Sequence, residues 1–221
     1  MTILVTGGAG FIGGNFVLDW VASSDETVIN LDKLTYAGNL ETLFTLHGNS
    51  SHIFVQGDIG DRVLVERLLA EHRPRAVINF AAESHVDRSI HGPGDFIETN
   101  IVGTYNLLES VRGYWNGLPE GQKAAFRFLH VSTDEVYGSL KPTDPPFAET
   151  NAYEPNSPYS ASKAAVQALT RTIALDCAAR GVPIRANLVH PGAIRTPMYD
   201  RYKYSGMAEP DEIERNFAAT H

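Results

Sequence analysis

The sequence predicts an α/β fold built on a doubly wound parallel sheet, and two observations lead to this class. Its apolar runs are short and rich in Val and Ile, and they alternate with stretches whose apolar residues recur at helical spacing. Strands that alternate with helices in this way form a parallel sheet with helices on both faces. The length of 221 residues allows one large domain, or one domain with an appendage, and excludes an array of domains.

The expected elements follow from these patterns in chain order. Six short apolar runs predict strands at residues 3–5, 27–31, 53–55, 76–80, 126–131 and 184–189. Helical spacing predicts helices at residues 11–21, 62–71, 101–114 and 161–179. Residues 140–158 hold five of the twelve prolines and are expected to form a surface loop. Beyond Pro191 the pattern weakens, and residues 210–219 are expected to form one short helix.

The charge balance of the chain limits its partners. Lys and Arg number 18, and Asp and Glu number 26, which gives a formal net charge of −8. This excess of acid argues against binding to a nucleic-acid backbone or to a membrane surface. The N-terminal segment lacks the pattern of a signal peptide, and no run approaches the roughly 20 apolar residues of a membrane span.

The chain contains a single cysteine, Cys177. An internal disulfide and a Cys-x-x-Cys metal or redox site are therefore excluded, and the histidines are too scattered to suggest a metal site. This cysteine usage is typical of the reducing cytosol, so we expect a cytoplasmic protein without a metal.

A glycine-rich turn follows the first expected strand, with glycines at Gly7, Gly10 and Gly13. A turn of this kind needs glycine for a tight bend, for backbone approach to a pyrophosphate and for close packing of helix on strand. The N-terminus of the next helix offers free N–H groups to the anion. An ordinary strand-to-helix turn is the alternative, but an acid at the end of the second strand favours a Rossmann-type dinucleotide site.

That acid is Asp32, 19 positions after Gly13, where a carboxylate accepts hydrogen bonds from the adenosine ribose. A carboxylate there repels a 2′-phosphate, so NAD is favoured over NADP, although the neighbouring Lys33 is a cation that acts in the opposite direction. Asp58, after the third expected strand, is placed to meet the adenine. Its alternative role is the N-cap of the helix that follows.

Tyr159 and Lys163 open the last long helix, and their spacing of four places both side chains on one face. A phenol has an ordinary pKa near 10, so its use as a base near neutrality needs a cation that stabilises the phenolate. Lys163 is expected to supply that charge and to hold the nicotinamide ribose. A chance pair on an exposed helix is the alternative, which the upstream dinucleotide turn makes less favourable.

Together, Thr-Gly-x-x-Gly-x-x-Gly at residues 6–13 and Tyr159-x-x-x-Lys163 resemble the short-chain dehydrogenase/reductase superfamily. Four further stretches are similar to the dTDP-glucose 4,6-dehydratase family of its extended branch: Asp32-Lys-Leu-Thr-Tyr-Ala-Gly-Asn-Leu-Glu41, Ala81-Ala-Glu-Ser-His-Val-Asp-Arg-Ser-Ile90, Glu98-Thr-Asn-Ile-Val-Gly-Thr104 and Ser132-Thr-Asp-Glu-Val-Tyr-Gly138. The resemblance covers residues 1 to about 165. It implies further contacts to NAD from Phe11, Ile12, Ile59, Ala81 and Ala82.

The resemblance implies an internal redox cycle on a nucleotide sugar. Tyr159 would take the proton of the C4 hydroxyl as hydride passes to NAD, with Thr133 hydrogen-bonded to the same oxygen. The ketone formed makes the C5 proton acidic, so that Glu135 would remove it while a protonated Asp134 donates to the departing C6 hydroxyl. Hydride then returns to C6. Without the resemblance, Asp134 and Glu135 could simply cap the loop after the fifth expected strand.

The loop after the fourth expected strand lies at the carboxyl edge of the sheet, where ligands of such folds bind. The substrate-binding residues that the resemblance implies are Ser84, His85, Arg88 and Asn187. For Arg88, a surface ion pair with Asp87 is the alternative. The resemblance also implies a homodimer whose seam follows the expected helices at residues 101–114 and 161–179.

The pattern changes after Lys163. Residues 187–197, which include His190 before a Pro-Gly pair, resemble the classical short-chain reductases, whose Pro-Gly turn packs on the nicotinamide. The further NAD contacts that this second resemblance implies are Pro191, Gly192, Ile194 and Thr196, and a strand-ending turn without a ligand is the alternative. We expect an NAD-binding domain over residues 1–197 and a short helical appendage, an incomplete substrate lobe, over residues 198–221. A hybrid or truncated dehydratase would have this organisation.

The leading functional expectation is a nucleotide-sugar 4,6-dehydratase, because Thr133, Asp134 and Glu135 together exceed what simpler reductases need. A classical NAD-dependent alcohol dehydrogenase or ketone reductase is the alternative that residues 187–197 support. An inactive cofactor-binding scaffold is the third.

Overall fold

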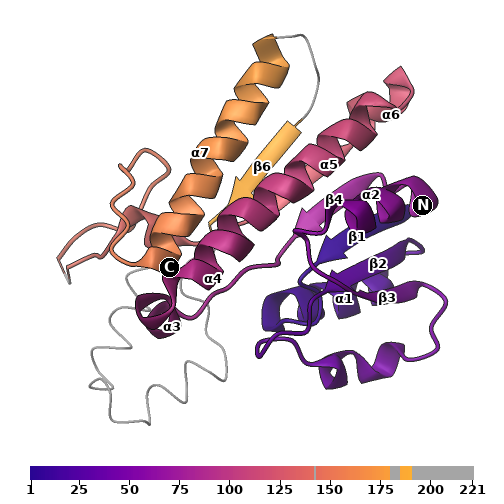
Figure 1. Ribbon diagram of the computed structural model, residues 1–221, viewed down its shortest axis with the longest axis horizontal. Coiled ribbons are helices and arrows are strands. Elements are labelled where there is room, and N and C mark those ends of the chain that lie inside the picture. Colours follow the sequence, from indigo (N-terminus) through magenta and orange to yellow (C-terminus); the bar gives the residue numbers. More distant parts are fainter. Residues whose placement is uncertain (142, 180–184, 191–221) are drawn as a thin grey trace.

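The computed structural model describes residues 1–141, 143–179 and 185–190 (Figure 1). The strands are β1 (Thr2–Thr6), β2 (Thr27–Asp32), β3 (His52–Gln56), β4 (Ala76–Asn79), β5 (Arg127–Val131) and β6 (Arg185–Val189). The α-helices are α1 (Phe11–Ser23), α2 (Arg62–His72), α3 (Val86–His91), α4 (Pro93–Phe96), α5 (Thr104–Asn116), α6 (Glu120–Ala125) and α7 (Pro158–Ala179). Three further segments are the 3₁₀ turns η1 (Leu40–Leu46) and η3 (Asp134–Tyr137) and the π-helical turn η2 (Ile97–Gly103).

The six strands form one sheet in the order β3-β2-β1-β4-β5-β6, and every pair is parallel. The predicted doubly wound parallel sheet is therefore confirmed. The strand order reverses between β1 and β4, and in such sheets ligands bind outside the carboxyl ends of the strands at this point. The loops that follow β1, β2, β4 and β5 all meet at this edge.

The sheet is covered on both faces, which explains why the residues of β1 and β2 after the first of each strand are all buried. One core cluster lies beneath α2 and α5 and includes Leu4, Val77 and Phe128. The other lies beneath α1 and η1 and includes Ile3 and Val28. Alternate residues of β1, β2 and β4 thus enter opposite cores, which fixes the register of these strands.

The helix expected at residues 101–114 differs from the observed one. The chain first forms η2 and then α5, so the regular helix begins at Thr104 and is preceded by one wide turn. The last long helix begins at Pro158, three residues before the expected start, because proline is well suited to a first helical position. The expected loop over residues 140–158 carries no helix or strand before Pro158 in its described part. The expected helix at residues 210–219 lies outside the described residues.

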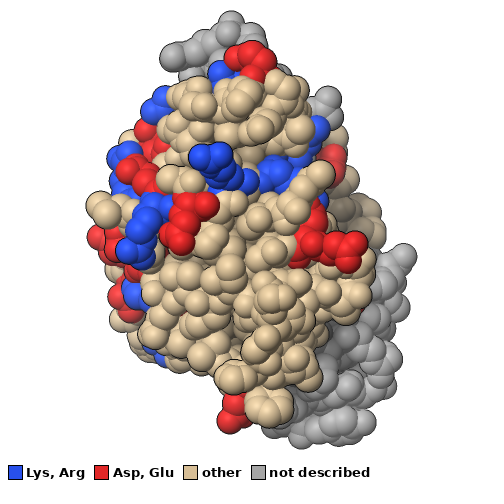
Figure 2. All heavy atoms as spheres, turned by 90° about the vertical axis from the view of Figure 1, so that its right-hand side faces the viewer, with Lys and Arg blue, Asp and Glu red and all other residues tan. Residues whose placement is uncertain are grey.

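The face of the molecule in Figure 2 carries blue and red side chains next to one another. Positive charge does not form a continuous surface on this face, as tracking of a nucleic-acid backbone would require. Across the described part of the chain, every helix is too short or too polar to span a membrane.

Candidate active site

The glycine-rich turn lies at the end of β1 and has little room for side chains. Gly7 has a left-handed φ of 73°, and a Cβ on it would lie 2.5 Å from the backbone nitrogen of Ala81. A Cβ on Gly13 would lie 2.3 Å from the carbonyl oxygen of Gly7. Gly10 caps α1 without a side-chain hydrogen bond, so the first N–H groups of the helix lack a side-chain acceptor. Phe11 and Ile12 in this first turn are more than half exposed.

Asp32 joins the glycine-rich turn to the end of β2. Its carboxylate accepts one hydrogen bond from the Ala9 N–H and one from the Leu34 N–H, each at 2.8 Å. The side chain is nearly buried, yet each oxygen keeps a second acceptor position. The carboxylate is therefore held in one orientation at the place where a ribose diol is expected.

Lys33 and Asp58 form an ion pair beside Asp32, with 2.7 Å between Nζ and Oδ2. Burial alone would raise the pKa of Asp58, but hydrogen bonds from Lys33 and from the Gly60 N–H outweigh it and lower the pKa. The N-cap of α2 is Asp61, whose side chain accepts from the Leu64 N–H. The alternative role of Asp58 as this cap is therefore wrong. Ile59 is buried in the core beneath α2 and α5.

The loop after β4 carries the remaining residues expected at this edge. Ala81 and Ala82 are half-buried, and the Ala81 N–H donates to the side chain of Asn79. Ser84 and His85 are exposed.

The Arg88 guanidinium does not pair with Asp87 as the alternative interpretation proposed. It lies 3.8 Å from the ring centroid of Tyr36, on whose ring the imidazole of His85 also packs. The loop after β2 thus contacts the loop after β4 across the end of β1.

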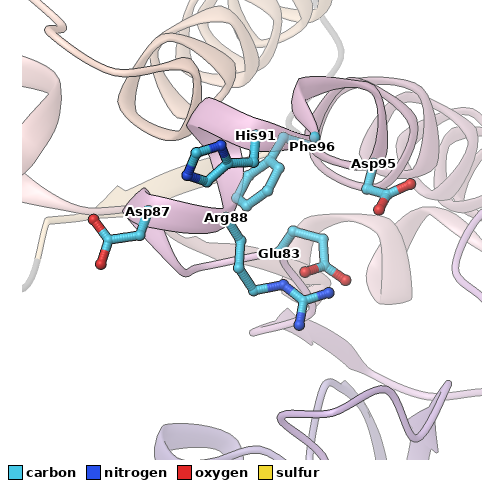
Figure 3. Close-up of a pocket in the computed structure, with 7 residues that line it drawn as sticks. Glu83, Asp87, Arg88, His91, Asp95 and Phe96 are labelled. Carbon is cyan, nitrogen blue, oxygen red and sulfur yellow. The ribbon is translucent and has the colours of Figure 1, made fainter.

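A pocket of about 390 Å³ opens beside this contact (Figure 3). Its lining consists of Glu83, Asp87, Arg88, His91, Gly92, Asp95 and Phe96. The ring of Phe96 packs edge-on against Tyr159, with 6.3 Å between centroids. The pocket is therefore adjacent to the first turn of α7.

Tyr159 and Lys163 are both nearly buried on α7. Burial, together with the negative charges of Glu135 and Asp134, raises the pKa of Tyr159 to about 12, and a hydrogen bond with Thr133 acts against this rise. Lys163 donates to the Val131 carbonyl at 3.2 Å, and burial lowers its pKa to about 8. The ammonium of Lys163 was expected to stabilise the phenolate of Tyr159. In this structure it instead donates to a backbone carbonyl, and the pKa of the Tyr159 phenol is raised.

Thr133, Asp134 and Glu135 follow β5 directly. Thr133 caps η3 by accepting from the Glu135 N–H at 3.3 Å, so the cap is the hydroxyl and neither carboxylate. Asp134 and Glu135 are half-buried, and burial raises the pKa of both carboxyls. The charge of Asp134 raises the pKa of Glu135 further. The structure thus brings the three residues together with Tyr159 at the carboxyl end of β5.

Sequence reasoning missed Asn100, a buried residue of η2. Its side chain accepts from the Glu83 N–H at 2.8 Å, and it donates to the Glu83 carbonyl at 3.0 Å and to the Ser162 hydroxyl at 2.9 Å. Ser162 in turn donates to the carbonyl of Tyr159. Asn100 therefore connects the pocket loop to the helix that carries Tyr159.

A second missed group supports the segment after β5 from behind. The Gln167 amide lies 2.8 Å from the Ser132 hydroxyl and 3.0 Å from Nδ1 of His190. The same His190 nitrogen lies 3.1 Å from the Thr133 carbonyl, and its ring packs on Tyr137. Gln167 lies one turn beyond Lys163, so the helical spacing that identified Tyr159 and Lys163 could have found it.

Asn187 lies on β6, in register with Leu129 of β5. The other residues that the second resemblance implied, Pro191, Gly192, Ile194 and Thr196, lie outside the described residues. The described residues contain no cluster of His, Cys, Asp and Glu that could hold a metal ion.

Two family models match the chain. The model described as GDP-mannose 4,6 dehydratase matches residues 4–180, and the model described as Enoyl-(Acyl carrier protein) reductase matches residues 147–219. The two resemblances inferred from the sequence, which differ between its first three quarters and its last part, are thereby confirmed.

Curated relatives are similar to the first part of the chain. A dTDP-glucose 4,6-dehydratase from Xanthomonas campestris pv. campestris (strain B100) is 69% identical over 170 residues, which cover 77% of this chain and 48% of that protein. One from Escherichia coli is 55% identical over 179 residues, covering 77% of this chain and 49% of that protein. The chain spans about half the length of the curated relatives it matches.

Solved structures of related proteins share the fold. The dTDP-glucose 4,6-dehydratase DesIV from Streptomyces venezuelae, crystallised with NAD, matches with a TM-score of 0.73 and 41% identity, over 85% of this chain and 55% of that one. A UDP-glucose 4-epimerase from Thermus thermophilus in complex with NAD matches with a TM-score of 0.69 and 32% identity, over 86% and 54%.

Proposed function

Because the chain belongs to the family described as GDP-mannose 4,6 dehydratase, we propose that it is an NAD-dependent nucleotide-sugar 4,6-dehydratase. Its substrate would be dTDP-glucose and its product a 4-keto-6-deoxy sugar. One observation carries this proposal. Thr133, Asp134 and Glu135 all act on the pKa of Tyr159, so a hydroxyl, two carboxyls and a phenol lie around one point. A simple alcohol dehydrogenase has no use for the two carboxyls.

The residues at the carboxyl edge fit a dinucleotide. Gly7 and Gly13 leave a space that a Cβ would fill, α1 begins without a side-chain cap, and Asp32 has free acceptor positions for a ribose diol. NAD bound there would supply reversible acceptance and return of a hydride. Lys163 would hold its nicotinamide ribose.

Tyr159 would accept the proton of the sugar C4 hydroxyl, with Thr133 hydrogen-bonded to the same oxygen. A phenol with a pKa of about 12 is a poor donor of its own proton near neutrality, so it must become more acidic before it can act as a base. Lys163 carries a positive charge at neutral pH, since its pKa of about 8 lies above 7. Movement of the ammonium from the Val131 carbonyl towards the phenol would supply the stabilising charge.

Asp134 and Glu135 would perform the elimination. Burial raises the pKa of both carboxyls; Asp134 as the protonated partner would donate to the departing C6 hydroxyl, and Glu135 as the carboxylate would remove the C5 proton. Two adjacent carboxyls titrate as a pair, in which one proton is shared before the second is taken up. Such a pair supplies one acid and one base at the same pH.

The substrate and assembly complete the proposal. Ser84, His85 and Arg88 would contact the nucleotide sugar from the loop after β4, and Asn187 from β6. We propose a cytoplasmic homodimer, with an NAD-binding domain over residues 1–197 and an appendage over residues 198–221. The exposed apolar side chains of Ile97, Val102 and Tyr105 lie on η2 and α5, which is the face expected to form the dimer seam.

The testing experiment incubates the protein with NAD and dTDP-glucose and follows the sugar by mass spectrometry and NMR. Loss of one water from the sugar, without net formation of NADH, supports the proposal. NADH that accumulates with simple secondary alcohols instead would indicate a classical dehydrogenase. Binding of NAD without either reaction would indicate a cofactor-binding scaffold and would contradict the proposed function.

A further inference from the structure

Lys33 occupies the position where a cation could change the choice of cofactor. It directly follows Asp32 at the end of β2, and Asp58 lies at the end of the neighbouring β3. The two side chains form the 2.7 Å ion pair described above, and the other Asp58 oxygen accepts from the Gly60 N–H at 2.8 Å. Asp58 is thus fixed by the backbone and holds the ammonium in one place.

Further carboxylates attract the same ammonium from beyond β1. The hydrogen bond with Asp58 raises the pKa of Lys33 most, and attraction by Asp58, Glu83 and Asp95 adds to it. Glu83 and Asp95 line the pocket of Figure 3, from the loop after β4 and from α4. The positive charge of Lys33 is therefore balanced by acids on both sides of the expected cofactor crevice.

The stability gained from this pair is small. Half-exposed ion pairs contribute little to folding, and 55% of the Lys33 side chain and 37% of the Asp58 side chain are exposed. A 2′-phosphate on the adenosine ribose, in contrast, needs a free cation near the end of β2. The consequence of the pair is therefore expected in cofactor recognition.

We infer that Asp58 is a specificity-determining residue, which withholds Lys33 from the 2′-phosphate of NADP and so reinforces the preference for NAD. Asp32 would repel the phosphate directly, whereas Asp58 engages a neighbouring cation that could compensate for this repulsion. The inference rests on the proposed function, because it requires that the chain bind a nicotinamide dinucleotide.

The test compares the parent with D58N, K33A and the double variant D58N/K33A. The dissociation constants of NAD and NADP are measured for each by calorimetry at low salt, and the ratio of the two is the readout. Asn at position 58 keeps an acceptor for the Gly60 N–H and loses the charge. We expect D58N to lower the NADP/NAD ratio of dissociation constants about tenfold, which corresponds to about 1.4 kcal/mol.

The other variants separate the ion pair from general charge. In D58N/K33A the NADP/NAD ratio of dissociation constants should return to the value of the parent, because the lysine that D58N frees is absent. K33A alone should leave the NADP affinity within twofold of the parent. D61N is the matched control: Asp61 is a nearby acid that caps α2 without contacting Lys33, and Asn is an equally good cap. D61N should leave the ratio unchanged.

Three results would overturn the inference. If D58N left the NADP/NAD ratio of dissociation constants unchanged, or if D61N lowered it as much as D58N, the Lys33–Asp58 ion pair would not select the cofactor. K33A that weakens NADP severalfold would mean that Lys33 is already free to bind the phosphate, and this variant decides the question even if D58N fails to fold. A folded parent that binds neither dinucleotide would overturn the proposed function and this inference with it, whereas retained NAD binding isolates a failure of the inference.

Discussion

Replacement of Lys163 by Met should make the protein more stable at neutral pH and remove part of its pH dependence. The ammonium is nearly buried and donates a hydrogen bond to the Val131 carbonyl. Burial lowers the pKa from the ordinary 10.5 to about 8, so the folded state disfavours the charged lysine. Met has a similar length, fills the same space and carries no charge to desolvate.

The magnitude follows from linkage between proton binding and folding. A pKa that falls from 10.5 to about 8 corresponds to about 3 kcal/mol of destabilisation at pH 7, where the lysine is charged in both states. The variant also loses the hydrogen bond to the Val131 carbonyl, which lowers its stability by about 1 kcal/mol. Lys163→Met should therefore raise the free energy of unfolding at pH 7 by about 2 kcal/mol.

The sign of the pH dependence separates this cause from simple repacking. Between pH 8 and 10.5 the unfolded chain keeps the lysine proton while the folded chain releases it, so the parent becomes more stable as pH rises. The variant lacks this rise, and its advantage should vanish near pH 10. Tyr159 has the opposite effect, because its pKa is raised: the stability it contributes is lost as pH rises from 10 to about 12. Measurements should therefore stop at pH 10.

Urea unfolding followed by tryptophan fluorescence between pH 6.5 and 10 provides the assay, without cofactor. Lys141→Met, at an exposed lysine, is the control and should follow the parent at every pH. If the parent and Lys163→Met changed in parallel with pH, the ammonium would not carry a desolvation cost in the folded protein, and the reasoning would be refuted.

Three further predictions concern the site. Tyr159→Phe should lower turnover of dTDP-glucose at least about 100-fold and leave the NAD affinity within about twofold, since only the hydroxyl is lost; turnover above a few per cent of the parent's would contradict this role. Glu135→Gln should permit oxidation at C4 but stop the loss of water, so that bound NADH accumulates and solvent deuterium no longer enters C5; exchange at the parent's rate would point to another base. Asn100→Ala should lower the free energy of unfolding by about 3 kcal/mol, because it removes three hydrogen bonds and leaves the main chain of Glu83 without these partners, whereas Asn106→Ala, which removes a single bond to Gly60, should lower it by about 1 kcal/mol; equal losses in urea unfolding would contradict this role of Asn100.

The strands were predictable because each is a short apolar run, and β1, β2 and β4 are almost wholly buried. The alternation of strand and helix then determined the parallel sheet. Six short segments were not predicted: α3, α4, α6, η1, η3 and most of η2. Residues 86–103 carry Pro93 and several polar residues, so their helical turns lack a periodic apolar face. These turns depend on contacts with α7, which no local pattern reports.

The candidate site was predictable where its residues follow a spacing rule. Residues of this kind are the glycines Gly7, Gly10 and Gly13, the acid Asp32, and the pair Tyr159 and Lys163. The burial of Tyr159 and Lys163 was not predictable from their spacing. This burial raises the pKa of the Tyr159 phenol, whereas the sequence led us to expect a lowered one. Asn100 also escaped prediction, because its importance comes from contacts with residues 17 and 62 positions away in the chain.

The contact among Thr133, Gln167 and His190 has a consequence for the exchange of segments between protein families. Thr133 lies only in the part matched by the first family model, His190 only in the part matched by the second, and Gln167 in both. Among the described residues, the parts matched by the two family models are connected by the main-chain pairing of β5 with β6 and by this amide–imidazole contact. Backbone pairing does not depend on side-chain identity. A chimera that grafts a foreign edge strand onto this sheet therefore has to keep a polar partner for Gln167 at the position of His190.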